Sequence, residues 1–182
     1  VEIMDEARDL SLELLGLSGN DYTSIFLQGG ASSQFLMTAY NFLKNEAAFL
    51  DTGTWSKKAI KEAKLFGNVD VLASSENDNY NHIPNFEIAK NYDYFHCTSN
   101  NTIFGTQINS FPNTDNPIFC DMSSDIFSRA LDFSKFDLIY AGAQKNLGPA
   151  GATLVVIKND LLNNIKDNVP SMMNYKVHAD KS

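Results

Sequence analysis

Residues 24–43 read SIFLQGGASSQFLMTAYNFL, and this stretch decides which fold class the chain is expected to adopt. Its first part, Ser24 to Leu27, has the length and apolar character of a buried strand. The pair Gly29-Gly30 ends that run, and the apolar residues from Phe35 onward then recur at helical spacing. A strand, a glycine turn and a helix in immediate succession predict an α/β fold.

The same alternation continues along the chain. Helices are expected at the N-terminus, over residues 55–66 with Gly67 at the C′ position, and from Asp160 onward. The N-terminal helix is expected from an apolar stripe at helical spacing: Ile3, Ala7, Leu10 and Leu14. Further short apolar runs each predict a strand: residues 47–50, 69–72, 94–97, 118–120, 138–140 and 152–157. We therefore expect one three-layer α/β/α domain with a mostly parallel central sheet.

Composition narrows the class of protein. The 182 residues are 43% hydrophobic and carry a net charge of −8, which argues against a disordered chain and against a nucleic-acid partner. No apolar run is long enough to span a membrane, and the start does not resemble a signal peptide. Two cysteines without CxxC or Cys/His spacing predict a reducing, cytoplasmic location and no metal site. The first residue is not Met and reads as the inside of a helix, so we expect a piece of a longer protein.

The loop Gly29-Gly30-Ala31-Ser32 is the first candidate binding element. Glycines allow close approach of a ligand, and the helix that follows offers unpaired amides to an anion such as a phosphate. The loop lacks the Gly-Lys-Ser/Thr of a P-loop and the spacing of a dinucleotide fingerprint. An ordinary strand-to-helix turn is the alternative interpretation.

Three further residues fall at or near the ends of predicted strands. Lys145 follows a strand among small residues, where loss of solvent would favour the neutral, nucleophilic amine; the alternative is a surface lysine. Asp121 ends a buried strand, where open α/β sheets bind ligands, although it could also form a helix cap or an Asx turn. Trp55 could stack on a flat cofactor or pack in the core. Together the four features match the needs of pyridoxal 5'-phosphate.

Five segments in family order resemble the phosphoserine aminotransferase family: residues 26–32 (FLQGGAS), 52–63 (TGTWSKKAIKEA), 97–106 (CTSNNTIFGT), 121–129 (DMSSDIFSR) and 139–151 (IYAGAQKNLGPAG). This resemblance implies an aspartate-aminotransferase-like fold in which residues 1–182 are the cofactor-binding large domain. A segment before residue 1 and the smaller C-terminal domain are then expected to be missing from this chain.

The resemblance also implies roles for individual residues. Lys145 would form a Schiff base with pyridoxal 5'-phosphate and move protons, and Asp121 would keep the ring nitrogen protonated. Trp55 would stack on the ring, and Thr102 would hydrogen-bond its phenolic oxygen. The residues expected to cradle the phosphate are Ala31, Ser32 and Gln144.

The implied activity is reversible amino transfer between O-phospho-L-serine and 2-oxoglutarate, or between glutamate and 3-phosphooxypyruvate, by a homodimer in serine biosynthesis and in some members also in pyridoxine biosynthesis. Some relatives carry Arg where this chain has Ser32, and its only arginines, Arg8 and Arg129, match no substrate position of the family. Two alternatives stay open. One is another enzyme of the same fold, such as a cysteine desulfurase or a different small-substrate aminotransferase. The other is a catalytically silent α/β binding module.

Overall fold

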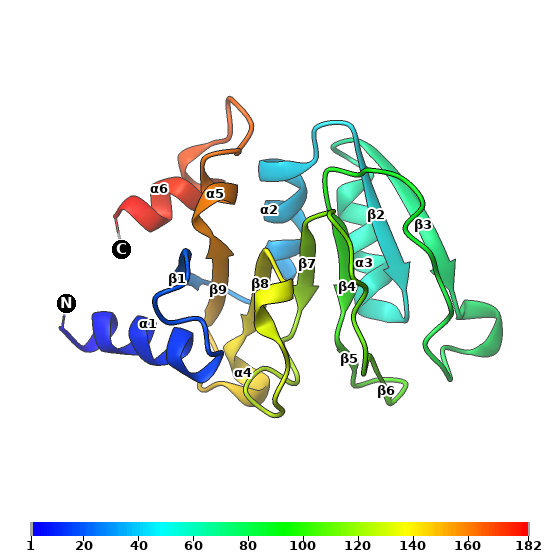
Figure 1. Cartoon of the computed structure of the whole chain (residues 1–182), viewed down its shortest axis with the longest axis horizontal. Coiled ribbons are helices and arrows are strands. Elements are labelled where there is room, and N and C mark those ends of the chain that lie inside the picture. The colour runs from blue at the N-terminus through cyan, green and yellow to red at the C-terminus, as the bar shows by residue number, and fades with distance from the viewer. Residues whose placement is uncertain (1, 182) are drawn as a thin grey trace.

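A computed structural model describes residues 2–181, in which seven strands form one twisted sheet (Figure 1). The strand order is β1-β9-β8-β7-β4-β2-β3, and only β9 runs against the others. The strands are β1 (Tyr22–Gln28), β2 (Glu46–Asp51), β3 (Asn68–Ser74), β4 (Phe95–Thr98), β7 (Ile118–Asp121), β8 (Leu138–Gly142) and β9 (Ala152–Lys158). Every predicted strand is present, so the expectation of a mostly parallel sheet is confirmed.

Helices and a small hairpin complete the described chain. The hairpin pairs β5 (Asn100–Asn101) with β6 (Thr106–Gln107) beyond the end of β4. Short 3₁₀ turns lie at Glu76–Asp78, Phe133–Lys135 and Ser171–Met173. The helices are α1 (Glu2–Leu14), α2 (Ser32–Phe42), α3 (Thr54–Ala63), α4 (Ala143–Asn146), α5 (Asn159–Leu162) and α6 (Tyr175–Asp180).

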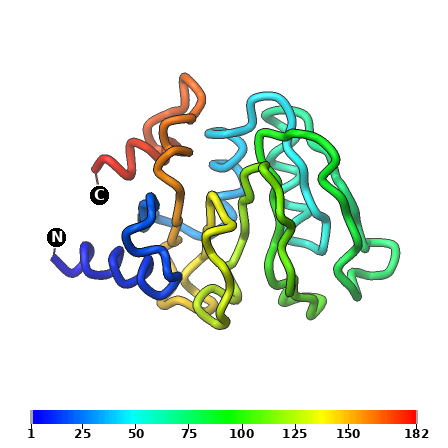
Figure 2. Tube along the Cα trace, viewed as in Figure 1, coloured from blue at the N-terminus to red at the C-terminus, as the bar shows by residue number. Residues whose placement is uncertain are grey.

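The two faces of the sheet are covered differently. Side chains of α2 and α3 pack with Phe49, Phe119 and Tyr140 in one apolar cluster. The cluster on the other face is closed by the end of α1 and by loop residues such as Phe111 and Phe136. The tube trace shows that α1 and α6 lie at the β1 end of the sheet (Figure 2). The third layer is thus built more from loops than from helices.

The expected C′ position of Gly67 is wrong, whereas the helices expected at the N-terminus and near Asp160 are present with features that the sequence did not predict. Helix α3 ends at Ala63, so its C′ position comes before Gly67. Gly67 instead packs closely against the side chain of Leu43. Helix α5 has only one turn. The apolar stripe of α1 is largely exposed, because Ser11, not Leu10 or Leu14, faces the sheet.

Two fully buried tyrosines allow a matched test of this packing. The Tyr175 hydroxyl donates to Gln34 Oε1 at 2.6 Å and so attaches α6 to α2, whereas the Tyr94 hydroxyl has no partner within residues 2–181. We expect Tyr175→Phe to lower the free energy of unfolding by about 1 to 3 kcal/mol, because Gln34 is left with a buried unpaired oxygen.

The control is Tyr94→Phe, which removes a hydroxyl that makes no hydrogen bond in the described chain. Measured by denaturant unfolding, the free energy of unfolding of this variant should equal or exceed that of the unaltered protein. Equal losses in the two variants would contradict the assignment of the Tyr175 hydrogen bond as a stabilising contact.

Candidate active site

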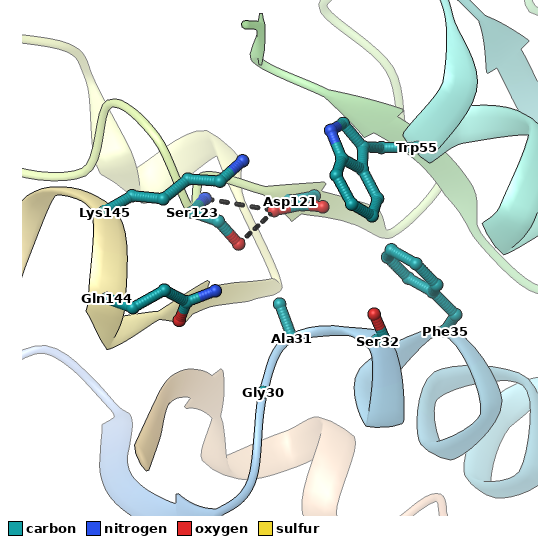
Figure 3. A pocket seen from close by; sticks show the side chains of 9 residues that line it. All are labelled: Gly30, Ala31, Ser32, Phe35, Trp55, Asp121, Ser123, Gln144 and Lys145. Carbon is teal, nitrogen blue, oxygen red and sulfur yellow. Dashed lines mark hydrogen bonds between the residues drawn. The ribbon is translucent and has the colours of Figure 1, made fainter. Parts of the chain in front are cut away.

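One pocket lies where several chain segments meet at the carboxyl ends of the parallel strands (Figure 3). In an open α/β sheet this is the edge at which ligands bind. The turn after β1, helix α3, the end of β7 and helix α4 all contribute to it. The lining residues are Gly30, Ala31, Ser32, Phe35, Trp55, Asp121, Ser123, Gln144 and Lys145. Six of the seven predicted site residues therefore lie together, although they are far apart in sequence.

The floor of the pocket is the turn that leads into α2. Ser33 and Gln34 donate their amides to the carbonyls of Gly30 and Ala31, at 3.1 and 2.9 Å. The amides of Ala31 and Ser32 precede these bonds and have no acceptor in the described part of the chain. Free amides at the positive end of an eleven-residue helix form an environment that suits an anion.

Gln144 approaches this turn from α4. A Cβ on Gly142 would lie 3.3 Å from the Ala31 amide nitrogen and 2.8 Å from Gln144 Oε1. The small residue at position 142 thus allows the start of α4 to pack directly against the turn that leads into α2. This close approach is consistent with the prediction that the cofactor phosphate is bound by Ala31, Ser32 and Gln144.

Asp121 is the buried acid of the pocket. Its Oδ1 accepts hydrogen bonds from the Ser123 amide at 3.0 Å and the Ser123 hydroxyl at 2.6 Å. Burial raises the pKa of Asp121 above its ordinary value, while the Ser123 hydrogen bonds and the positive charge of Lys145 act in the opposite direction. Within residues 2–181 its Oδ2 has no hydrogen-bond partner, so one oxygen remains available to a ligand.

Lys145 and Trp55 face each other across the pocket. The Lys145 Nζ lies 5.1 Å from the centre of the Trp55 ring, and Figure 3 shows Asp121 between these two side chains. Lys58 Nζ lies 4.5 Å from the same ring but does not line the pocket. Lys145 is exposed, so the expected withdrawal of this amine from water is not seen in the described chain. The one-turn helix α4 places it at the open rim.

One predicted site residue lies outside the pocket, and the two arginines, as expected, are not part of it. Thr102 is exposed on the turn that follows β5 and does not line the pocket. Arg8 pairs with Asp5 at 2.8 Å, and Arg129 pairs with Asp125 at 3.0 Å, so neither arginine reaches the site. No cluster of three or more metal-ligating side chains occurs among residues 2–181.

The sequence did not identify two lining residues. The sequence suggested Ser123 only as part of an Asx turn after Asp121. In the structure the Ser123 amide and hydroxyl both donate to Asp121, so the same turn also lines the pocket. Phe35 was assigned to the apolar face of its helix, yet its ring lies beside Trp55 at the pocket (Figure 3). The helical periodicity predicts burial of Phe35 but not which buried partner it meets.

The model of the aminotransferase class-V family matches residues 1–179. The chain belongs to this family. None of the helices in the described range is long and apolar enough to cross a membrane.

Relatives within the class-V family share most of this chain. A phosphoserine aminotransferase from Flavobacterium johnsoniae is 63% identical over 181 residues, which are 98% of this chain and 51% of that protein. A solved phosphoserine aminotransferase from Bacillus circulans subsp. alkalophilus is 44% identical, with a TM-score of 0.94 over 99% of this chain and 51% of that one. A solved pyridoxal-phosphate-bound phosphoserine aminotransferase from Trichomonas vaginalis is 33% identical, with a TM-score of 0.89 over 99% of this chain and 52% of that one.

This likeness confirms the expected fold. The chain spans about half the length of the curated relatives it matches, so it accounts for one part of the architecture that they have.

Proposed function

We propose that the complete protein is a phosphoserine aminotransferase that uses pyridoxal 5'-phosphate. It transfers an amino group reversibly between O-phospho-L-serine and 2-oxoglutarate, a reaction of serine biosynthesis. The observation that carries this proposal is the common pocket of Lys145, Asp121 and Trp55. Its further support is the 63% identity to a phosphoserine aminotransferase.

The residues of the pocket fit the cofactor chemically. The unengaged Oδ2 of Asp121 is an acceptor for a protonated ring nitrogen. The Trp55 ring is a flat stacking surface, and the start of α2 offers amides to the phosphate. Lys145 Nζ is the amine that would hold the aldehyde. Pyridoxal phosphate, when bound, supplies a sink for the electrons of a bond broken at the amino acid's α-carbon.

Each catalytic side chain has one task in this proposal. Lys145 Nζ carries a proton to and from the substrate's α-carbon, which requires a mobile side chain such as the exposed lysine seen here. Asp121 supplies a fixed negative charge, and the two Ser123 hydrogen bonds hold its orientation. The Ser123 hydroxyl oxygen accepts the Gly142 amide at 3.1 Å, which connects the turn after β7 to the strand that leads into Lys145.

The remaining assignments concern the whole protein. We propose that residues 1–182 form its cofactor-binding large domain, and that the groups which read the substrate's carboxylate and phosphate lie outside this chain. Support for the second point is that both arginines are paired away from the pocket. A homodimer is proposed from the family resemblance. A cytoplasmic location is proposed because Cys97 and Cys120 are buried next to each other as free thiols and form no disulfide.

The test is a substrate panel with the complete protein and added pyridoxal phosphate. Glutamate formation from 2-oxoglutarate is followed with O-phosphoserine, alanine or cysteine as the amino donor. We expect kcat/KM for O-phosphoserine to exceed that for the other donors by at least about 100-fold. The reason is that polar groups placed to bind the substrate phosphate stay unpaired when the amino acid carries no phosphate. Release of sulfide from cysteine without amino transfer would instead identify a desulfurase.

A further inference from the structure

The position of Trp55 depends on the turn between β2 and α3, and a buried carboxylate lies at the base of this turn. Asp51 is the last residue of β2 and is only 5% exposed. Its Oδ1 accepts the Ser56 hydroxyl at 3.0 Å and the Gly53 amide at 3.4 Å. These bonds span the segment that carries Trp55 and fix its direction from the strand.

The second oxygen of the same carboxylate holds a different part of the chain. Asp51 Oδ2 accepts the Ser74 hydroxyl at 2.8 Å and the Tyr80 hydroxyl at 3.1 Å. Ser74 ends β3, and Tyr80 follows the 3₁₀ turn at Glu76–Asp78. One carboxylate therefore joins the Trp55 turn to the end of the edge strand and to the loop after it.

The hairpin that carries Thr102 is attached to the same turn. A Cβ on Gly53, whose φ is +153°, would lie 2.0 Å from Asn101 Nδ2, so only glycine allows this contact. Asn101 Nδ2 donates to the carbonyl of Thr52. The Phe104 ring packs on Tyr80 with 4.9 Å between ring centres. Tyr80 is thus bonded to Asp51 on one side and packed on the hairpin on the other.

Asp51 is held only by neutral donors. It forms no ion pair with any described lysine, arginine or histidine, although buried carboxylates are usually paired with a cation. Burial raises the pKa of Tyr80 to about 12, with the negative charge of Asp51 as a further cause, so Tyr80 keeps its proton and remains a donor at neutral pH. The network therefore depends on the exact placement of three hydroxyl groups and one amide.

We propose that Asp51 is a positioning residue for Trp55: through Ser56, Ser74 and Tyr80 it holds the indole where a flat ligand stacks, and through Tyr80, on which Phe104 packs, it holds the hairpin against the same turn. The inference rests on the proposed function only in the identity of the ligand, pyridoxal phosphate. It predicts that loss of the network displaces the indole and weakens cofactor binding without removing any residue that lines the pocket.

The experiment uses the complete protein labelled with 5-fluorotryptophan. The ¹⁹F resonance of Trp55 is assigned by its loss in Trp55→Phe, and the cofactor-free protein is compared with Asp51→Asn and Tyr80→Phe. Binding of pyridoxal phosphate is measured in parallel by equilibrium dialysis. The matched control is Tyr92→Phe, because Tyr92 also donates to a carboxylate, Asp70 Oδ2 at 2.5 Å, but is not bonded to the Trp55 turn.

We expect Asp51→Asn and Tyr80→Phe to shift or broaden the Trp55 resonance. They should also raise the Kd of pyridoxal phosphate about 10-fold, the lower end of the loss seen when a residue that orients a metal ligand is removed. Tyr92→Phe should do neither. An unchanged Trp55 resonance in Tyr80→Phe, which removes only a hydroxyl, would overturn the inference even if Asp51→Asn fails to fold. Displaced resonances in a protein that binds no pyridoxal phosphate would support Asp51 as the positioning residue and reject the proposed function.

Discussion

Replacing Lys145 by alanine in the complete protein is expected to lower kcat for O-phosphoserine by about a thousandfold or more. The lysine amine is the only described amine that lines the pocket, and it lies opposite Trp55 with Asp121 between them. A positioned acid–base group contributes a factor of about 100 to 10,000 to a rate, and this amine would also hold the cofactor. The measurement is the initial rate of glutamate formation at saturating pyridoxal phosphate.

Lys58→Ala is the matched control for this prediction. Lys58 Nζ is closer to the Trp55 ring than Lys145 Nζ, at 4.5 Å against 5.1 Å, but it belongs to the outer side of α3 and not to the pocket. The control variant should keep nearly full activity. If Lys145→Ala is as active as Lys58→Ala, the account of catalysis given above is wrong.

Replacing Asp121 by asparagine is expected to lower kcat by about 100- to 1,000-fold, the usual cost of losing one preorganised electrostatic partner. Asparagine has nearly the same shape, and its oxygen can still accept both hydrogen bonds from Ser123. The negative charge that would keep the ring nitrogen protonated is lost. The matched control is Asp137→Asn, which removes a carboxylate that pairs with Lys158 at 2.9 Å, away from the pocket.

Asp121→Asn should raise the stability of the cofactor-free protein at neutral pH, although it lowers kcat. Because burial raises the pKa of Asp121, the folded cofactor-free protein binds a proton at this carboxyl more readily than the unfolded chain does. The free energy of unfolding therefore falls as pH rises from the ordinary aspartate pKa to the raised one, and the loss persists at neutral pH. We expect cofactor-free Asp121→Asn to have the higher Tm at pH 7 and to lose this advantage in acid. A lower Tm at pH 7 would contradict the burial argument.

Local sequence patterns predicted the strands well because buried parallel strands are continuous apolar runs. The run at residues 24–27 and the glycine pair after it led directly to β1, the turn after it and α2. Candidate site residues could be selected because the carboxyl ends of parallel strands lie on one edge of the sheet. That rule depends only on the topology of the sheet, so it could select Asp121 and Lys145 as neighbours without any distances. Both residues line the same pocket in the structure.

Features that depend on contacts between distant segments were not predicted. The Asp51 network joins residues up to 29 positions apart, and nothing in the local sequence shows that Tyr80 turns back toward β2. The exposure of the α1 stripe could not be predicted either, since periodicity reports which residues share a helix face but not whether that face is covered. Likewise, small residues around Lys145 did not guarantee its burial.

The most direct test of the central claim is to find where pyridoxal phosphate becomes attached. The complete protein is incubated with the cofactor, treated with borohydride, digested, and mapped by mass spectrometry. The account predicts a phosphopyridoxyl group on the peptide that contains Lys145, and its loss in Lys145→Ala. A stoichiometric label on any other lysine, with Lys145 unmodified, would contradict it.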